Sequence, residues 1–244
     1  MEIKVIGTGS KGNSYILTDE RGNSLILELG VNIKQIKKEL DFDISKVAGC
    51  LVTHEHGDHA KYIHDAIFHG LNVYATKGTL NAKNVNLNDH NVISLTYFEQ
   101  ENIGPFTIVP FDTQHDVSEP CGFLIHHPES GNILFLTDTT YCKYQFESLN
   151  HIIIETNYSE EIINESEDPD FLKNRIIKSH MSIESAITML KKYDLSNCNN
   201  ILLIHLSDRN ADANVFKNKM IGNFGIETNV AESGSVFKLN EFAF

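Results

Sequence analysis

The chain has 244 residues, of which 41% are hydrophobic, and this length and composition predict one globular domain over residues 1–244. No apolar run approaches the roughly 18 residues that a membrane-spanning helix needs, so we expect no membrane partner. The net charge of −13 argues against the basic track with which proteins that hold long nucleic acids neutralise phosphates.

Cysteine usage and the N-terminal pattern indicate the compartment. Four cysteines are scattered without a CxxC pair, and residues 1–5 lead directly into a strand pattern rather than a basic segment followed by an apolar one. Disulfide frameworks and signal peptides are typical of secreted chains. We therefore expect a cytoplasmic location.

Short apolar runs between turn residues predict strands along the whole chain. They cover residues 3–6, 15–17, 25–27, 47–52, 106–110, 122–125, 133–136, 152–154, 201–204 and 235–239. Apolar residues at helical spacing predict helices at 33–40, 62–68, 183–190 (with Ser182 as N-cap) and 211–221. The polar stretch 159–169 is predicted to be a mobile loop or an insertion. This mixture predicts an α/β fold with two packed sheets and helices outside them.

Residues 7–12 match GxGxxG after the first predicted strand, a pattern typical of dinucleotide-binding loops. Such a loop needs a helix directly after the glycines, because the helix N-terminus binds the pyrophosphate. Residues 13–17 instead have the pattern of a second strand. We therefore interpret the glycines as a tight hairpin that borders the active site.

The segment 53–59, directly after a predicted strand, carries three imidazoles and two carboxylates within six residues. Bringing so many polar groups together is costly unless metal ions pair them. The spacing divides them between two ions, with His54 and His56 on the first and Asp58 and His59 on the second. Nitrogen and oxygen ligands without a thiolate favour zinc, with manganese as the alternative.

This HxHxDH pattern resembles the signature of the metallo-β-lactamase superfamily, whose fold is an αββα sandwich of two β-sheets flanked by helices. The resemblance implies three further ligands on loops that follow strands, and the candidates are His115, Asp138 and His205. It assigns His54, His56 and His115 to the first ion and Asp58, His59 and His205 to the second, with Asp138 bridging both.

Within that superfamily the chain looks like the phosphodiesterase branch. Its opening GTGSKGNS and the segments 172–176, 179–182 and 205–207 resemble WalJ-like (YycJ-like) proteins, which are predicted exonucleases. His180 followed by the His-x-Ser of 205–207 also resembles tRNase Z. Two positions depart from the WalJ-like pattern, because Tyr158 replaces a histidine and Ser179 replaces the glycine before His180.

The departures and the net charge favour a small substrate, because two metal ions can neutralise one phosphodiester without a basic track. Compact phage anti-Pycsar enzymes, which the chain also resembles, hydrolyse cyclic mononucleotides. We therefore predict a dinuclear-metal phosphodiesterase that hydrolyses a cyclic mononucleotide. A WalJ-like 5'–3' DNA exonuclease is the first alternative, and a non-catalytic metal-binding protein is the second.

The predicted site also assigns roles to individual residues. Asp58 is expected to orient a water whose pKa the ions lower, and His180 to contact the phosphate or protonate the leaving oxygen. Asn157 and Tyr158 are candidates for contacts to the base or sugar, and Ser182 for a further substrate contact. By analogy with relatives, a homodimer is the expected assembly.

Overall fold

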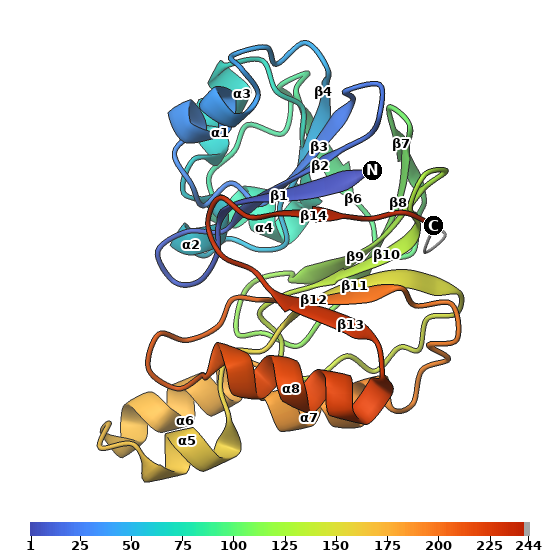
Figure 1. Ribbon diagram of the computed structural model, residues 1–244. Helices are drawn as coiled ribbons and strands as arrows, with labels where there is room; N and C mark the ends of the chain where they lie inside the picture. The colour runs from blue at the N-terminus through green and yellow to red at the C-terminus, as the bar shows by residue number, and fades with distance from the viewer. Residues whose placement is uncertain (242–244) are drawn as a thin grey trace.

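The computed structural model describes residues 1–241 and contains two seven-stranded β-sheets packed face to face (Figure 1). The first sheet has the strand order β14 (Val236–Lys238), β1 (Glu2–Gly7), β2 (Ser14–Thr18), β3 (Ser24–Leu27), β4 (Val47–Leu51), β5 (Val73–Thr76) and β6 (Val92–Leu95). The second has the order β13 (Glu227–Val230), β12 (Asn200–Ile204), β11 (Leu149–Glu155), β10 (Gly131–Leu136), β9 (Cys121–His127), β8 (Phe106–Asp112) and β7 (Glu101–Ile103).

Helices cover the outer face of each sheet (Figure 1). The first sheet is covered by α1 (Ile33–Glu39), α2 (Gly57–Ala60), α3 (Ile63–Phe68) and α4 (Lys77–Ala82). The second sheet is covered by α7 (Ile183–Leu190) and α8 (Ala213–Phe224). Two further helices, α5 (Glu160–Glu165) and α6 (Asp170–Ser179), project past the end of the second sheet (Figure 1). The αββα sandwich predicted from the sequence is confirmed.

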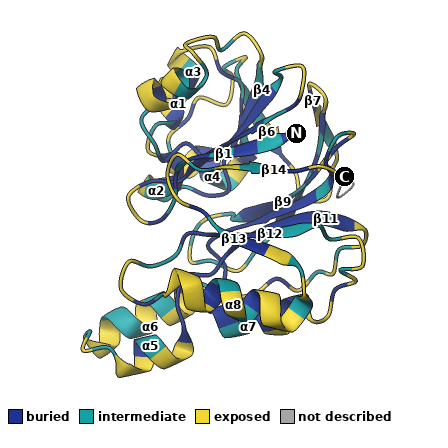
Figure 2. Cartoon of the chain, viewed as in Figure 1, coloured by how far each residue is buried: buried dark blue, intermediate teal, exposed yellow. Residues whose placement is uncertain are grey.

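Three apolar layers hold the sandwich together. Tyr15 and Phe135 meet edge to face at 5.8 Å in the layer between the two sheets. Phe216 of α8 packs in the second layer, and Ile36 of α1 in the third. Figure 2 shows the strands mostly buried and the solvent-facing sides of the helices exposed. Complete burial of one such side chain contributes about 1.5–3 kcal/mol, so the first layer holds the two sheets together and the other two hold the helices on them.

Parallel pairing places the ends of several strands at one edge of the sandwich. Strands β3 to β6 pair in parallel in the first sheet, and β10 to β13 do so in the second. The carboxyl ends of parallel strands meet at the same edge, which is where α/β proteins bind ligands. The segments that follow β4, β10, β11 and β12 therefore share one end of the molecule.

The structure also differs from the sequence-based expectations. Strands β5, β6, β7 and β13 were not predicted, because they are short and carry few consecutive apolar residues. The loop predicted at 159–169 is wrong in part, since α5 occupies residues 160–165. This helix buries only Ile163, so its apolar spacing leaves little trace in the sequence.

Two broader expectations concern the whole chain. None of the helices within residues 1–241 is long and apolar enough to span a membrane. That residues 1–244 make one domain stays a prediction, and its last three residues lie outside the described part of the chain.

Candidate metal centre

Seven side chains that the sequence predicts as metal ligands converge at the common edge of the two sheets. Their donor atoms form two groups, each within 4.8 Å: His54, His56, His115 and Asp138, and Asp58, His59, Asp138 and His205. Asp138 belongs to both groups. The segment after β4 delivers four of these residues because its chain turns directly into the short helix α2.

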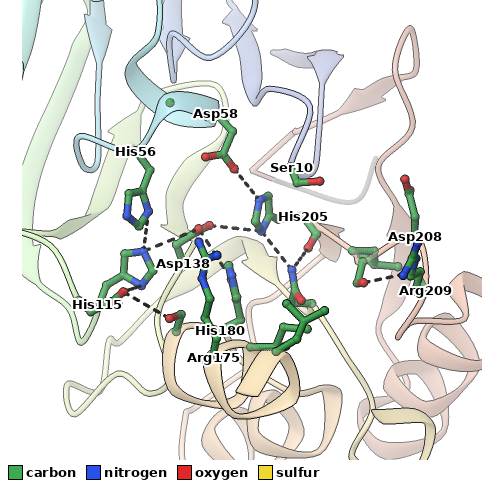
Figure 3. A pocket seen from close by; sticks show the side chains of 18 residues that line it. Ser10, His56, Asp58, His115, Asp138, Arg175, His180, His205, Asp208 and Arg209 are labelled. Atoms are coloured by element: carbon green, nitrogen blue, oxygen red, sulfur yellow. Dashed lines mark hydrogen bonds and ion pairs between the residues drawn. The ribbon is translucent and has the colours of Figure 1, made fainter. Parts of the chain in front are cut away.

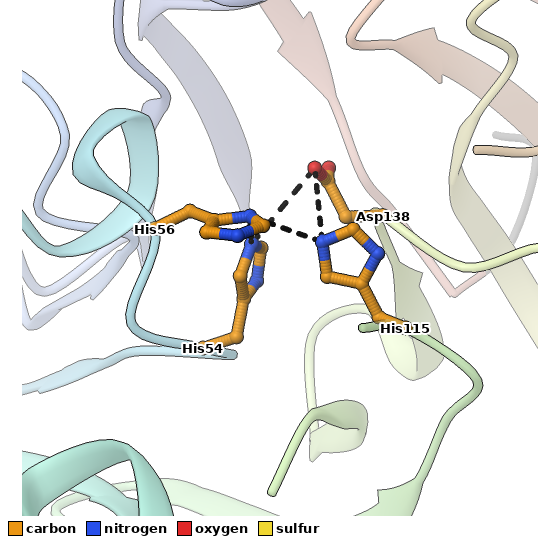
Figure 4. Close-up of side chains that lie close together, drawn as sticks. All are labelled: His54, His56, His115 and Asp138. Atoms are coloured by element: carbon orange, nitrogen blue, oxygen red, sulfur yellow. Dashed lines mark hydrogen bonds and ion pairs between the residues drawn. The ribbon is translucent and has the colours of Figure 1, made fainter. Parts of the chain in front are cut away.

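The first group has the spacing of ligands around one small cation (Figure 4). Nδ1 of His56 lies 3.2 Å from Nε2 of His54 and 3.1 Å from Nε2 of His115. An oxygen of Asp138 lies 3.9 and 4.0 Å from the same two Nε2 atoms. Tetrahedral Zn–N bonds of about 2.0–2.1 Å separate two nitrogens by about 3.3 Å, so these donors fit a zinc-sized ion.

The second group combines two imidazoles with two carboxylates. Nε2 of His59 lies 3.3 Å from Oδ1 of Asp138 and 3.5 Å from Oδ2 of Asp58. Nε2 of His205 lies 3.3 Å from the same oxygen of Asp58. This donor set suits a second divalent ion, with Asp138 between the two positions.

Glu155, a residue to which the sequence assigns no role, supports both sides of the cluster from behind. It is fully buried at the end of β11. Its Oε1 lies 2.6 Å from Nδ1 of His180 and 2.8 Å from Nδ1 of His205, while its Oε2 accepts from the backbone N–H groups of Thr139 and Met181. An ionised carboxylate only accepts hydrogen bonds, so both imidazoles carry a proton on Nδ1 and keep Nε2 for the cavity.

Glu28 has the same supporting position on the first sheet. It is also fully buried, and its Oε1 accepts from the hydroxyl of Thr53 at 2.6 Å and lies 3.5 Å from Nδ1 of His59. The hydroxyl of Thr53 lies 2.9 Å from Nδ1 of His54. One carboxylate thus lies behind both groups, in contact with His59 of the second and linked through Thr53 to His54 of the first.

Three residues of this cluster and its support have strained backbone conformations. Within the described residues, eight non-glycine residues have positive φ, and three of them are Glu28, Asp138 and His205, at 68°, 38° and 55°. Such conformations cost on the order of 1–3 kcal/mol each and persist only where the surroundings enforce them. The sandwich therefore stores strain at the place where these three side chains must point inward.

The glycines near the cluster allow two segments to approach closely. Asn13 of the β1–β2 loop donates its backbone N–H to the carbonyl of Asp58 at 2.7 Å, and a Cβ on Gly30 would lie 1.7 Å from that carbonyl oxygen. The GxGxxG segment connects β1 to β2, as predicted, and Thr8 within it accepts from the backbone N–H of His205. These glycines let the segments that surround the cluster pack closely.

Burial and nearby charge set the ionisation of the ligands. Burial lowers the pKa of His54 well below its usual range and also lowers that of His115. Burial opposes the charge of Asp138, but the surrounding histidines, His205 first, lower its pKa well below the usual value. Burial likewise opposes the charge of His205, yet Asp138 and two further carboxylates raise its pKa to about 10. Metals bind neutral imidazoles, so an ion in the second group must displace a proton.

A cavity of about 610 Å³ opens in front of the cluster (Figure 3). Among the predicted catalytic and substrate residues, Asp58, His180 and Asn157 line it. The substrate contacts of Tyr158 and Ser182 stay predictions, and both side chains are buried and do not line the cavity. Ser182 instead caps α7 by accepting from the N–H of Ser185.

Several other residues line the cavity without a role predicted from the sequence. Ser10 comes from the β1–β2 loop, Arg175 from α6, and Asp208 and Arg209 from the loop after β12. Ser10 and Arg175 lie in segments that resemble WalJ-like proteins, but their common location with Asp208 and Arg209 depends on contacts between segments far apart in the chain. The cavity thus has a wall of metal ligands and an opposite wall built from α6 and the loop after β12.

The chain matches the β-lactamase superfamily domain over residues 32–206, which is more than half of its length. It is 28% identical to exodeoxyribonuclease YycJ of Bacillus anthracis in an alignment of 223 positions that covers 85% of this chain and 83% of the relative. Among solved structures, it is similar to the metallo-β-lactamase-fold protein YhfI of Bacillus subtilis, at 20% identity and a TM-score of 0.76 over 97% of this chain and 98% of YhfI.

The short form of human tRNase Z has the same fold, at 16% identity and a TM-score of 0.65 over 98% of this chain and 99% of the other. The sandwich and the histidine–aspartate cluster agree with these similarities. The chain therefore belongs to the β-lactamase superfamily and is a hydrolase of the metallo-β-lactamase fold.

Proposed function

We propose that this hydrolase is a phosphodiesterase that works with two divalent ions, zinc first and manganese as the alternative. The observation that carries the proposal is the pair of donor groups that share Asp138 beside an open cavity. Bound there, the ions would acidify water and offset the charge that builds on phosphoryl oxygens. Each of the seven predicted ligand residues contributes a donor atom to one of the two groups, which disfavours a non-catalytic metal-binding protein.

His180 is the proposed acid that protonates the leaving oxygen. Glu155 holds its Nδ1, so the Nε2 side of the ring is left for the cavity that His180 lines. Burial opposes the charge of His180, but Glu155 and Asp138 raise its pKa above the usual value, which favours the protonated ring that an acid needs.

Two further residues position water and substrate in this proposal. Asp58 is the carboxylate that orients the attacking water. Asn157 donates its side-chain N–H to the carbonyl of His205, so its amide oxygen is the atom available to a sugar or base.

For the substrate, we propose a DNA strand end as the first candidate. Two observations support it: the similarity to exodeoxyribonuclease YycJ extends over 85% of the chain, and two arginines line the cavity. A cyclic mononucleotide is the second candidate, and the net charge of −13 favours it. The sequence-based preference between the two is thus reversed.

Hydrolysis assays test the function and the substrate together. The wild type and His56→Ala are compared on cyclic mononucleotides and on single- and double-stranded DNA, with Zn²⁺ or Mn²⁺. We expect DNA shortening by the wild type and none by the variant. Turnover of cyclic nucleotides with intact DNA would establish the second candidate, and equal activity of the two proteins would refute the metal-dependent mechanism.

A homodimer and a cytoplasmic location stay predictions. The assembly is measured by light scattering during gel filtration, where a mass of one chain would refute the dimer. Metal content per chain, measured by mass spectrometry of the purified protein, tests the number of ions: two per chain are expected.

A further inference from the structure

The cavity concentrates the chain's arginines. The sequence contains three arginines and seventeen lysines. Two of the three arginines, Arg175 and Arg209, line the cavity in front of the metal cluster, and within residues 1–241 no lysine lines it. The planar guanidinium group matches two phosphate oxygens at once, whereas a lysine acts as a point charge. The cations of this wall are thus of the kind best suited to phosphate.

The two arginines come from different segments. Arg175 reaches from α6 toward the cluster on the side of His180, whereas Arg209 lies on the other side beside Asp208 (Figure 3). A ligand that contacts both must therefore extend across the cavity. A single phosphate at the metal cluster would meet only the nearer arginine.

Both guanidinium groups are accessible to a ligand. Within the described residues Arg175 has no ion pair and no side-chain hydrogen bond, although it stands in a cavity that also contains carboxylates. Nη1 of Arg209 lies 3.4 Å from Asp168, but the arginine side chain is 77% exposed. Exposed pairs of this kind contribute at most about 1 kcal/mol, so a phosphate can displace the carboxylate.

Apolar side chains complete the same wall. Leu172 and Ile176 flank Arg175 on α6 and line the cavity, as does Leu206 after β12. Apolar surface beside phosphate-binding cations suits the sugar and the face of a base. The wall therefore offers contacts for more of a nucleotide chain than one phosphate.

We propose that Arg175 and Arg209 form a two-point site for a nucleotide strand, in which Arg175 binds the scissile phosphate and Arg209 binds a neighbouring phosphate. This inference rests on the proposed phosphodiesterase function and specifies its substrate as a chain with at least two phosphates. A cyclic mononucleotide has only one and leaves Arg209 unused. Local placement of two arginines makes such binding compatible with a net charge of −13.

The test compares two substrates with the metal-loaded protein. Thymidine 5'-(p-nitrophenyl phosphate) carries one phosphodiester, and 5'-phosphorylated trithymidylate carries three phosphates. We expect Arg209→Ala to lower kcat/KM for the trinucleotide at least tenfold relative to the one-phosphate ester. Arg175→Ala is expected to lower both values, with partial rescue by Arg175→Lys. Arg21→Ala, on the exposed turn between β2 and β3, is the matched control and keeps the wild-type ratio.

Binding provides a readout independent of turnover. Fluorescence anisotropy with a phosphorothioate oligothymidylate gives the slope of the log binding constant against log salt concentration. This slope is negative, and loss of one phosphate contact reduces its magnitude by about 0.7 for a single strand. We expect this change in Arg209→Ala. If the wild type hydrolyses both substrates while Arg209→Ala keeps the wild-type ratio and slope, the two-point site is refuted. If the wild type hydrolyses neither, the proposed function itself fails.

Discussion

The two walls of the cavity differ in how they are held. The inner wall consists of metal-ligand candidates such as Asp138 and His205, which are buried and paired with one another, and His205 also contacts the carboxylate of Glu155. The outer wall consists of α6 and the loop after β12, and its Arg175 and Arg209 are exposed. The sandwich core thus holds the donor groups in place, whereas elements outside it supply the exposed arginines of the cavity.

The largest effect is expected from a substitution at the centre of the inner wall. Asp138→Ala removes the one residue common to both donor groups. Loss of metal assistance costs several kcal/mol in the transition state, which corresponds to a rate loss on the order of 10³-fold or more. Initial rates and metal content per chain measure this loss. Arg209→Ala, in the outer wall, is the control and is expected to keep its metal. If Asp138→Ala keeps full metal content and the wild-type rate, Asp138 is not a metal ligand.

The two buried glutamates behind the inner wall are expected to differ in their effects. Glu28→Gln affects only metal-ligand orientation, so we expect about 10–100-fold weaker metal binding and recovery of kcat at saturating metal. Glu155→Gln also removes the anionic partner of His180, so kcat should stay about 10²-fold low at saturating metal, with KM changed much less. Titrations of kcat and KM against zinc separate the two. Full recovery of Glu155→Gln would show that Glu155 acts through the metal alone.

A smaller effect, on the free energy of unfolding, is expected from Gly30, which lies against the segment that carries Asp58. Gly30→Ala puts a methyl group against the carbonyl of Asp58, and such overpacking costs about 1–3 kcal/mol of unfolding free energy. Gly222→Ala is the matched control, because its Cβ meets nothing within 4 Å and alanine favours a helix by about 0.5–1 kcal/mol. Urea unfolding measures both. Equal stability of the two variants would mean that the segments around Gly30 move apart without cost.

Short-range patterns in the sequence predicted much of the fold. Apolar runs located strands such as β1 and β12, and the capping residue Ser182 marked the start of α7, because these signals lie within a few neighbouring residues. Short elements with one buried face, such as β7 and α5, escaped, because tertiary contacts rather than local pattern stabilise them. Burial of Tyr158 likewise depends on packing that a linear pattern does not contain.

The local sequence already fixes the types and order of the candidate donors, since the spacing of residues 54–59 divides imidazoles and carboxylates between two donor groups. The tertiary structure was needed to show which distant residues support these candidate ligands and which lie across the cavity from them. Glu155 meets His205 across 50 positions, and Arg175 and Arg209 reach one cavity from separate segments. Local spacing constrains side chains a few residues apart, whereas these contacts arise from parallel strands that end at one edge of two packed sheets.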